Sequence, residues 1–89
     1  MIVVALAGLA TGATSAWADA AAGDACAAKL NADGKLVYAA VVAANPTLEN
    51  LRSTVEEQAR GLVFGGKIAR DGARDNAVAA GECVRARLQ

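Results

Sequence analysis

The sequence predicts an all-α protein: a small three-helix bundle, or a helical hairpin plus one helix, closed by one disulfide bond. Apolar residues recur at helical spacing in three consecutive segments of residues 32–89. Helix-ending pairs separate these segments, Asn45–Pro46 after the first and Gly65–Gly66 after the second. Two cysteines flank most of this region. Short connections between the three segments favour an antiparallel arrangement.

The first helix is expected over residues 32–44. Asn31 is the expected N-cap, because its side chain can accept a hydrogen bond from the first turn of backbone. Asp33 in that turn complements the positive end of the helix dipole. The apolar positions with helical spacing are Leu36, Val37, Ala40, Val41 and Ala44. Proline disfavours helix at the residue before it, so the helix ends at Asn45–Pro46.

The second helix is expected to begin after Thr47, a favourable N-cap residue, with Glu49 in its first turn. Its apolar stripe comprises Leu48, Leu51, Val55, Ala59 and Leu62. Glycine readily adopts the left-handed conformation that ends helices, so we expect this helix to stop at Gly65–Gly66.

The third helix is expected from about Arg70 to the end of the chain. Its inner face comprises Ala73, Ala77, Ala80, Val84 and Leu88. Asp71 and Asp75 lie near the positive end of its dipole. Because they also neighbour Arg70 and Arg74, we expect ion pairs on the exposed side of the helix.

Residues 1–18 are typical of a signal peptide. An uncharged apolar run over residues 2–10 precedes the small-x-small motif Ala16-Trp17-Ala18, so we expect cleavage after Ala18, with Ala20 as the alternative. The run is shorter than the roughly 20 residues that span a bilayer, which leaves no stable membrane anchor after cleavage. Met1 meets this run without the usual Lys or Arg, and we expect the true start to lie upstream.

We therefore divide the chain into a signal peptide at 1–18, a flexible Ala- and Gly-rich lead-in at 19–31, and a small helical domain at 32–89. The expected location is periplasmic or secreted, where disulfides persist. Two cysteines in a small exported chain favour one bridge, here Cys26 to Cys83. An intermolecular bridge is the alternative. A redox-active pair lacks the Cys-x-x-Cys spacing that lowers a thiol pKa.

Residues that carry catalytic chemistry are scarce. The chain has no His, which removes the usual general base and zinc ligand. Ser53 lies within a predicted helix, and Glu56 and Glu57 are adjacent, so their side chains point in different directions. The segment 31–34 resembles part of a calcium loop, but acidic residues are missing at both ends of that register. We expect no catalytic residue, no metal site, no cofactor and no enzymatic activity.

Charge excludes some partners. Nine basic and nine acidic residues give a net charge of zero, so the whole molecule has no general attraction to nucleic acid or anionic membrane. Acidic residues gather in the first part of the mature chain and basic residues in the second. We expect solvated helix faces, with a basic surface at Lys67, Arg70 and Arg74 as the alternative. Were residues 1–18 not a signal peptide, the two arginines would suit a DNA-binding helix-turn-helix.

Several short segments occur in an order that resembles a group of small, uncharacterised exported bacterial proteins. These segments are Cys26-Ala27-Ala28-Lys29-Leu30, Leu36-Val37-Tyr38, Gly66-Lys67-Ile68, Ala73-Arg74 and Ala80-Gly81-Glu82-Cys83. The resemblance covers nearly the whole mature chain and implies a shared helical fold and a shared disulfide, but no activity. The chain departs from the group at Gly34 and Gly65, where residues with higher helix propensity are expected, which implies lower stability.

These observations favour a non-enzymatic periplasmic or secreted protein, a structural or interaction module whose partner is an unknown envelope protein rather than nucleic acid. The alternative is a periplasmic stress chaperone, a holdase that exposes apolar helix faces when its thin core loosens. A carrier of small molecules or metals is a third hypothesis, for which the chain offers few aromatic residues and no ligand cluster.

Overall fold

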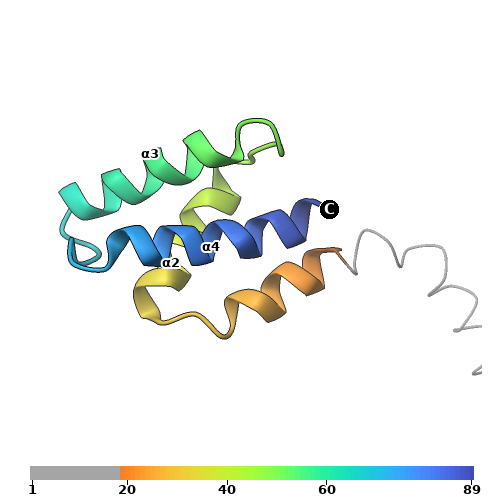
Figure 1. Cartoon of the computed structure of the whole chain (residues 1–89), viewed down its shortest axis with the longest axis horizontal. Coiled ribbons are helices and arrows are strands. Elements are labelled where there is room, and N and C mark those ends of the chain that lie inside the picture. The colour runs from red at the N-terminus through yellow and green to blue at the C-terminus, as the bar shows by residue number, and fades with distance from the viewer. Residues whose placement is uncertain (1–18) are drawn as a thin grey trace, which may run out of the picture.

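The computed structural model describes residues 19–89. It contains helices α2 (Ala32–Ala43), α3 (Leu51–Phe64) and α4 (Ala73–Leu88), preceded by a helical segment over residues 19–27 (Figure 1). No strand occurs in this part of the chain, so the predicted all-α class is confirmed. The predicted signal peptide, residues 1–18, lies outside the described residues.

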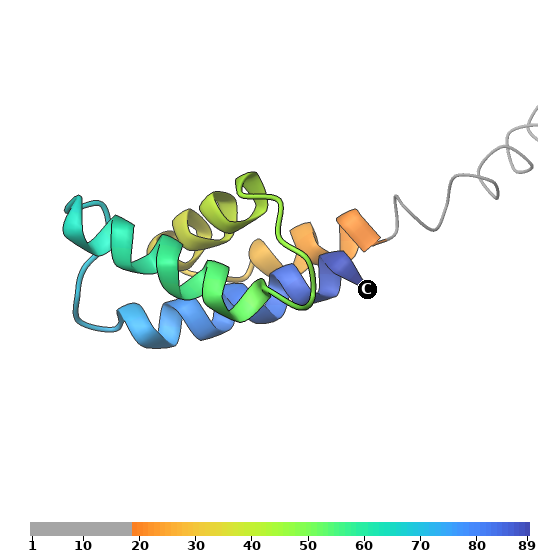
Figure 2. The same ribbon diagram turned by 90° about the horizontal axis from the view of Figure 1, so that it is seen from above.

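Helix α4 is the central element. Figure 1 shows α3 along one side of α4 and the segment 19–27 along the other, with α2 behind. Figure 2, seen from above, has α3 nearest the viewer over α2 and α4, and the segment 19–27 beside the C-terminal half of α4. A bridge between Cys26 and Cys83 holds this segment to α4, with the two Cα atoms 5.3 Å apart, so the predicted disulfide is confirmed.

The core is made of small apolar side chains from all these elements. Val37 and Val41 of α2 are fully buried against Ala80, Cys83 and Val84 of α4. The remaining buried apolar residues are Ala27, Tyr38, Leu51, Val55, Ala59 and Ile68. Because Ala and Val bury little area each, the hydrophobic stabilisation per residue is modest.

Helix α2 follows its prediction closely. Asn31 is the N-cap, and its Oδ1 accepts a hydrogen bond of 2.7 Å from the Gly34 backbone N–H. A Cβ at Gly34 would lie 3.1 Å from Leu30 Cβ and 3.3 Å from Asn31 Oδ1, so close packing at the cap favours glycine there. Leu36, expected on the inner face, is 44% exposed, and Tyr38 is buried instead.

The second helix begins later than predicted. Thr47 Oγ1 accepts a hydrogen bond from the Asn50 N–H, and Asn50 Oδ1 accepts one from the Thr47 N–H. This reciprocal pair closes a turn over residues 48–50, and α3 begins at Leu51. Leu48 therefore lies outside the helix and is exposed rather than part of the apolar stripe.

The third helix also begins later than expected. Gly72 adopts a left-handed φ of 82°, which ends the loop after α3, and α4 starts at Ala73. Arg70 consequently belongs to the loop. Among residues 19–89, neither Arg70 nor Arg74 forms the expected ion pair with Asp71 or Asp75.

The expected flexible lead-in differs most from the structure, because residues 19–27 are helical and docked. Gly23 is buried where the segment approaches α4, and a Cβ there would lie 2.5 Å from Arg87 Cβ. Asp24 Oδ1 accepts hydrogen bonds from the Tyr38 hydroxyl at 2.9 Å and from Arg87 Nη1 at 3.1 Å. The Ala-rich composition, taken as a sign of flexibility, has high helix propensity once one face is held in place.

Candidate functional site: the groove between α3 and α4

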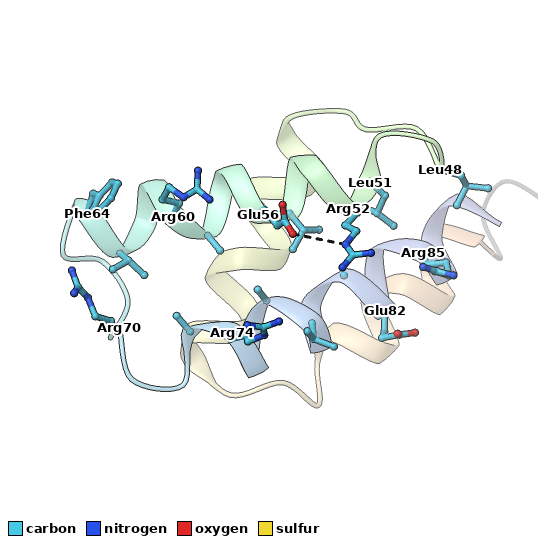
Figure 3. Close-up of a pocket in the computed structure, with 17 residues that line it drawn as sticks. Leu48, Leu51, Arg52, Glu56, Arg60, Phe64, Arg70, Arg74, Glu82 and Arg85 are labelled. Carbon is cyan, nitrogen blue, oxygen red and sulfur yellow. Dashed lines mark ion pairs between the residues drawn. The ribbon is translucent and has the colours of Figure 1, made fainter.

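Helices α3 and α4 leave an open groove of about 910 Å³ between them, which we call the α3–α4 groove (Figure 3). Within residues 19–89, its lining comes from α3, from α4 and from the segments next to α3. No described residue of α2 contributes to it. The groove therefore lies on the face of the α3–α4 pair that α2 leaves uncovered.

The floor of the groove is apolar. Leu51, Val55 and Ala59 of α3 form one side, and each is at most 7% exposed. Ala77 and Gly81 of α4 form the other side. A Cβ at Gly81 would meet Val55 Cγ2 at 3.5 Å, an ordinary van der Waals distance, so the two helices are already close at the floor.

Exposed apolar side chains extend this floor. Phe64 is 74% exposed at the C-terminal end of α3, and Leu48 is 53% exposed at the other end (Figure 3). Val78 of α4 is 58% exposed. These are three of the four large apolar side chains that are exposed among the described residues, and the fourth, Leu36, lies on α2. All three line the groove, one at each end and one on α4, which makes the groove the candidate binding surface of the described residues.

The rim of the groove is basic. It carries five arginines and two glutamates, all exposed: Arg52, Arg60, Arg70, Arg74, Arg85, Glu56 and Glu82. Five of the nine basic residues of the chain but two of its nine acidic residues therefore line the groove, a local net charge of +3. The rest of the chain holds four basic and seven acidic residues and has a net charge of −3.

Most of this positive charge has no ion-pair partner within residues 19–89. Arg52 Nε lies 3.8 Å from Glu56 Oε2, but both side chains are largely exposed and such a pair contributes little stability. Within residues 19–89, the other four groove arginines form no ion pair. In this part of the chain their guanidinium groups donate no side-chain hydrogen bond, so their donors face solvent.

The charge is also unevenly distributed along the groove. Arg60 and Arg70 lie toward the Phe64 end, while Arg74 and Glu56 lie near the middle of the groove on opposite walls (Figure 3). The remaining charged lining residues, Arg52, Arg85 and Glu82, lie toward the Leu48 end. The Phe64 end is thus the positive end of the groove.

The predicted basic surface is only partly brought together. Arg70 and Arg74 line the groove, whereas Lys67 lies in the exposed turn after α3 and does not. The predicted surface of Lys67, Arg70 and Arg74 did not include Arg85 of α4 or Arg52 and Arg60 of α3. The spacing of eight residues between Arg52 and Arg60 places both on one face of a helix, next to the apolar stripe, and that pattern was the available signal.

The tyrosine hydroxyl between the segment 19–27 and α4 belongs to a different part of the molecule. Burial raises the pKa of Tyr38 above its usual value of 10.0, and the hydrogen bond to Asp24 raises it further, while Arg87 opposes both effects. Because this group joins three elements of the fold, its role is structural.

Residues 19–89 contain neither a cluster of metal-ligating side chains nor a helix that could span a membrane. No three His, Cys, Asp or Glu side chains lie together in a way that could hold a metal ion. None of the described helices has the length and apolar character needed to cross a membrane.

Comparison of the chain with models of protein families, with curated proteins and with solved structures found no match. The functional argument therefore rests on the geometry and charge of the α3–α4 groove.

Proposed function

We propose that the protein is a non-enzymatic interaction module of the periplasm or the extracellular space, and that it binds a protein partner of the envelope through the α3–α4 groove. One observation carries the proposal: exposed apolar side chains line the same groove as four arginines that form no ion pair within residues 19–89. An apolar centre with a polar, arginine-rich rim is the usual composition of protein interfaces.

Two observations support the compartment. The Cys26–Cys83 disulfide indicates a non-reducing environment, since cytosolic thiols are kept reduced. Residues 1–18 have the apolar run and the small-x-small motif of a cleavable signal peptide. Mass spectrometry of the native protein tests both: we expect a chain that starts at Asp19 or Ala21, is two hydrogens lighter than its reduced form and resists thiol alkylation. A full-length chain with two free thiols would contradict export.

Groove binding is tested by photo-crosslinking in the cells that produce the protein. A photoreactive amino acid replaces Val78 in the groove, and a matched variant carries it at Leu36, which is also exposed and apolar but lies on α2. We expect discrete protein adducts from position 78 and none of the same mass from position 36. Equal adducts from both positions, or none from position 78, would refute binding through the groove.

The alternative function is a holdase, favoured by the exposure of Phe64, Leu48 and Val78 in the folded chain. A holdase would suppress aggregation of unrelated unfolded proteins and would give a smear of adducts rather than discrete ones. An aggregation assay with a heat-denatured client at neutral and mildly acidic pH separates the two functions. Failure to suppress aggregation at any pH would exclude the holdase.

A further inference from the structure

We propose that the occupant of the α3–α4 groove is an acidic amphipathic helix of the partner protein, seated as an additional helix against α3 and α4. This inference rests on the proposed function of the groove and specifies its ligand. Three features carry it: the dimensions of the groove, the position of its apolar residues and the distribution of its charge.

The dimensions fit a helix. The walls are helices of 14 and 16 residues, about 21 to 24 Å long at 1.5 Å per residue. A partner helix of about four turns would extend from Phe64 to Leu48 (Figure 3). The hollow between two adjacent helices receives a third through ridge-into-groove packing.

The apolar residues require a stripe on the partner. The floor formed by Leu51, Val55 and Ala59 runs along the groove, and Phe64 and Leu48 lie at its two ends. A helix that covers this surface needs apolar side chains at positions i, i+3 or i+4, and i+7, the spacing by which helices bind in apolar grooves. Burial of Phe64, now 74% exposed, would be the largest single apolar gain.

The charge requires acidic residues beside that stripe. The rim has a net charge of +3, and its arginines can form paired hydrogen bonds with carboxylates. Because Arg60 and Arg70 lie toward the Phe64 end and neither lining glutamate does, the acidic residues of the partner would lie mainly in the half of its helix near Phe64. The half near Leu48 would be closer to neutral.

The same features disfavour other occupants. A second copy of the chain bound groove to groove would bring two rims of equal positive charge together, which opposes association. An anionic bilayer is flat on this scale and would reach the rim arginines without covering the buried floor at Val55 and Ala59. A helix contacts the rim and the floor at the same time.

The test identifies the molecule that crosslinks to the photoreactive amino acid placed at position 78. Mass spectrometry identifies which peptide of the partner is attached, and we expect a helix-forming segment with net negative charge and an apolar stripe. A basic peptide, a peptide without an apolar stripe, or a lipid at this position would overturn the inference while leaving binding through the groove intact. The absence of any adduct specific to position 78 would instead refute the proposed function itself.

Charge reversal adds a quantitative test. The mapped segment is synthesised with a fluorescent label, and its affinity is measured by anisotropy. R60E with R74E should weaken binding at least tenfold, whereas K29E with K35E, the same change of charge away from the groove, should alter it less than twofold. Circular dichroism checks that both variants fold. Equal loss in both pairs, or binding that is insensitive to salt, would overturn the electrostatic part of the inference.

Vesicles of phosphatidylethanolamine and phosphatidylglycerol test whether an anionic membrane binds the groove instead. We expect no co-sedimentation of the wild-type protein with them at physiological salt. Co-sedimentation that is lost in the R60E and R74E variant would identify an anionic membrane as the ligand of the rim and would overturn the helix proposal.

Discussion

Reduction of the Cys26–Cys83 disulfide should remove most of the stability of this domain. The two cysteines are 57 positions apart, so the bond closes a loop that contains α2, α3 and most of α4. In the chain-entropy treatment, a loop of this size contributes about 4 kcal/mol at 25 °C. A domain of this size has a total free energy of unfolding of about 4 to 10 kcal/mol. The bond therefore accounts for a large share of the total.

The comparison should be made on one sequence, oxidised against reduced. Cys83 is 1% exposed in the core, so replacement by Ser would bury a hydroxyl and replacement by Ala would leave a cavity. Either substitution would add its own penalty to the loss of the bond. A reductant that does not absorb in the far ultraviolet leaves every other atom of the protein unchanged.

The assay is urea denaturation followed by circular dichroism. The free energy of unfolding of small domains typically falls by about 1 kcal/mol per molar urea, the m-value. A loss of about 4 kcal/mol in this free energy therefore lowers the urea midpoint by about 4 M. We expect the reduced protein to be largely unfolded at 37 °C. Oxidised and reduced midpoints within about 0.5 M of each other would refute the reasoning, because they would mean that α2, α3 and α4 hold the fold without the bond.

Three further predictions concern single positions. Gly61→Ala in α3 should raise the free energy of unfolding by about 0.5 to 1 kcal/mol, because the new Cβ meets nothing within 4 Å. Gly66→Ala should lower it, because Gly66 has a φ of 72° that alanine adopts only with strain. The urea midpoints of the two variants should therefore move in opposite directions. Gly23→Ala should destabilise by about 1 to 3 kcal/mol because the new Cβ would overlap Arg87, and an unchanged midpoint would contradict the close approach. The folded state holds the Tyr38 proton more tightly than the unfolded state, so the stability that this group contributes is complete below pH 10 and is lost as the pH rises above 10. Absorbance at 295 nm follows the ionisation of this single tyrosine, and its midpoint should lie at higher pH in the folded than in the unfolded protein. Equal midpoints would refute the raised pKa.

Features set by local chemistry could be predicted from the sequence. Asn31 caps α2 as expected, since the hydrogen bond to Gly34 lies within one turn of backbone. The Cys26–Cys83 bridge followed from the number of cysteines and the expected compartment. Boundaries were less accurate: the Thr47–Asn50 turn delays α3, because a capping residue marks where a turn begins and not where the regular helix begins.

Features that depend on tertiary contacts could not be predicted. Helical structure at 19–27 requires Gly23 to approach Arg87 and Asp24 to reach Tyr38, contacts that join residues 14 to 64 positions apart. The groove likewise depends on how α3 and α4 are rotated about their axes. Periodicity alone does not fix that rotation to the precision needed to place Arg60 and Arg74 on one rim.

A net charge of zero conceals a charge separation that bears on function. Stability and solubility alone favour mixed signs over a surface, because like charges on adjacent helices repel. Here the groove carries +3 and the rest of the chain −3, although Asp71 and Asp75 lie close in sequence to Arg70 and Arg74 and form no ion pair with them. In the free protein these arginines are exposed to solvent, and within residues 19–89 Arg60, Arg70, Arg74 and Arg85 form no ion pair. A bound acidic helix would supply carboxylate partners, so charge reversal at Arg60 and Arg74 should weaken binding at least tenfold. The urea midpoint of the free protein should stay unchanged or fall slightly, because R60E places a carboxylate four residues after Glu56.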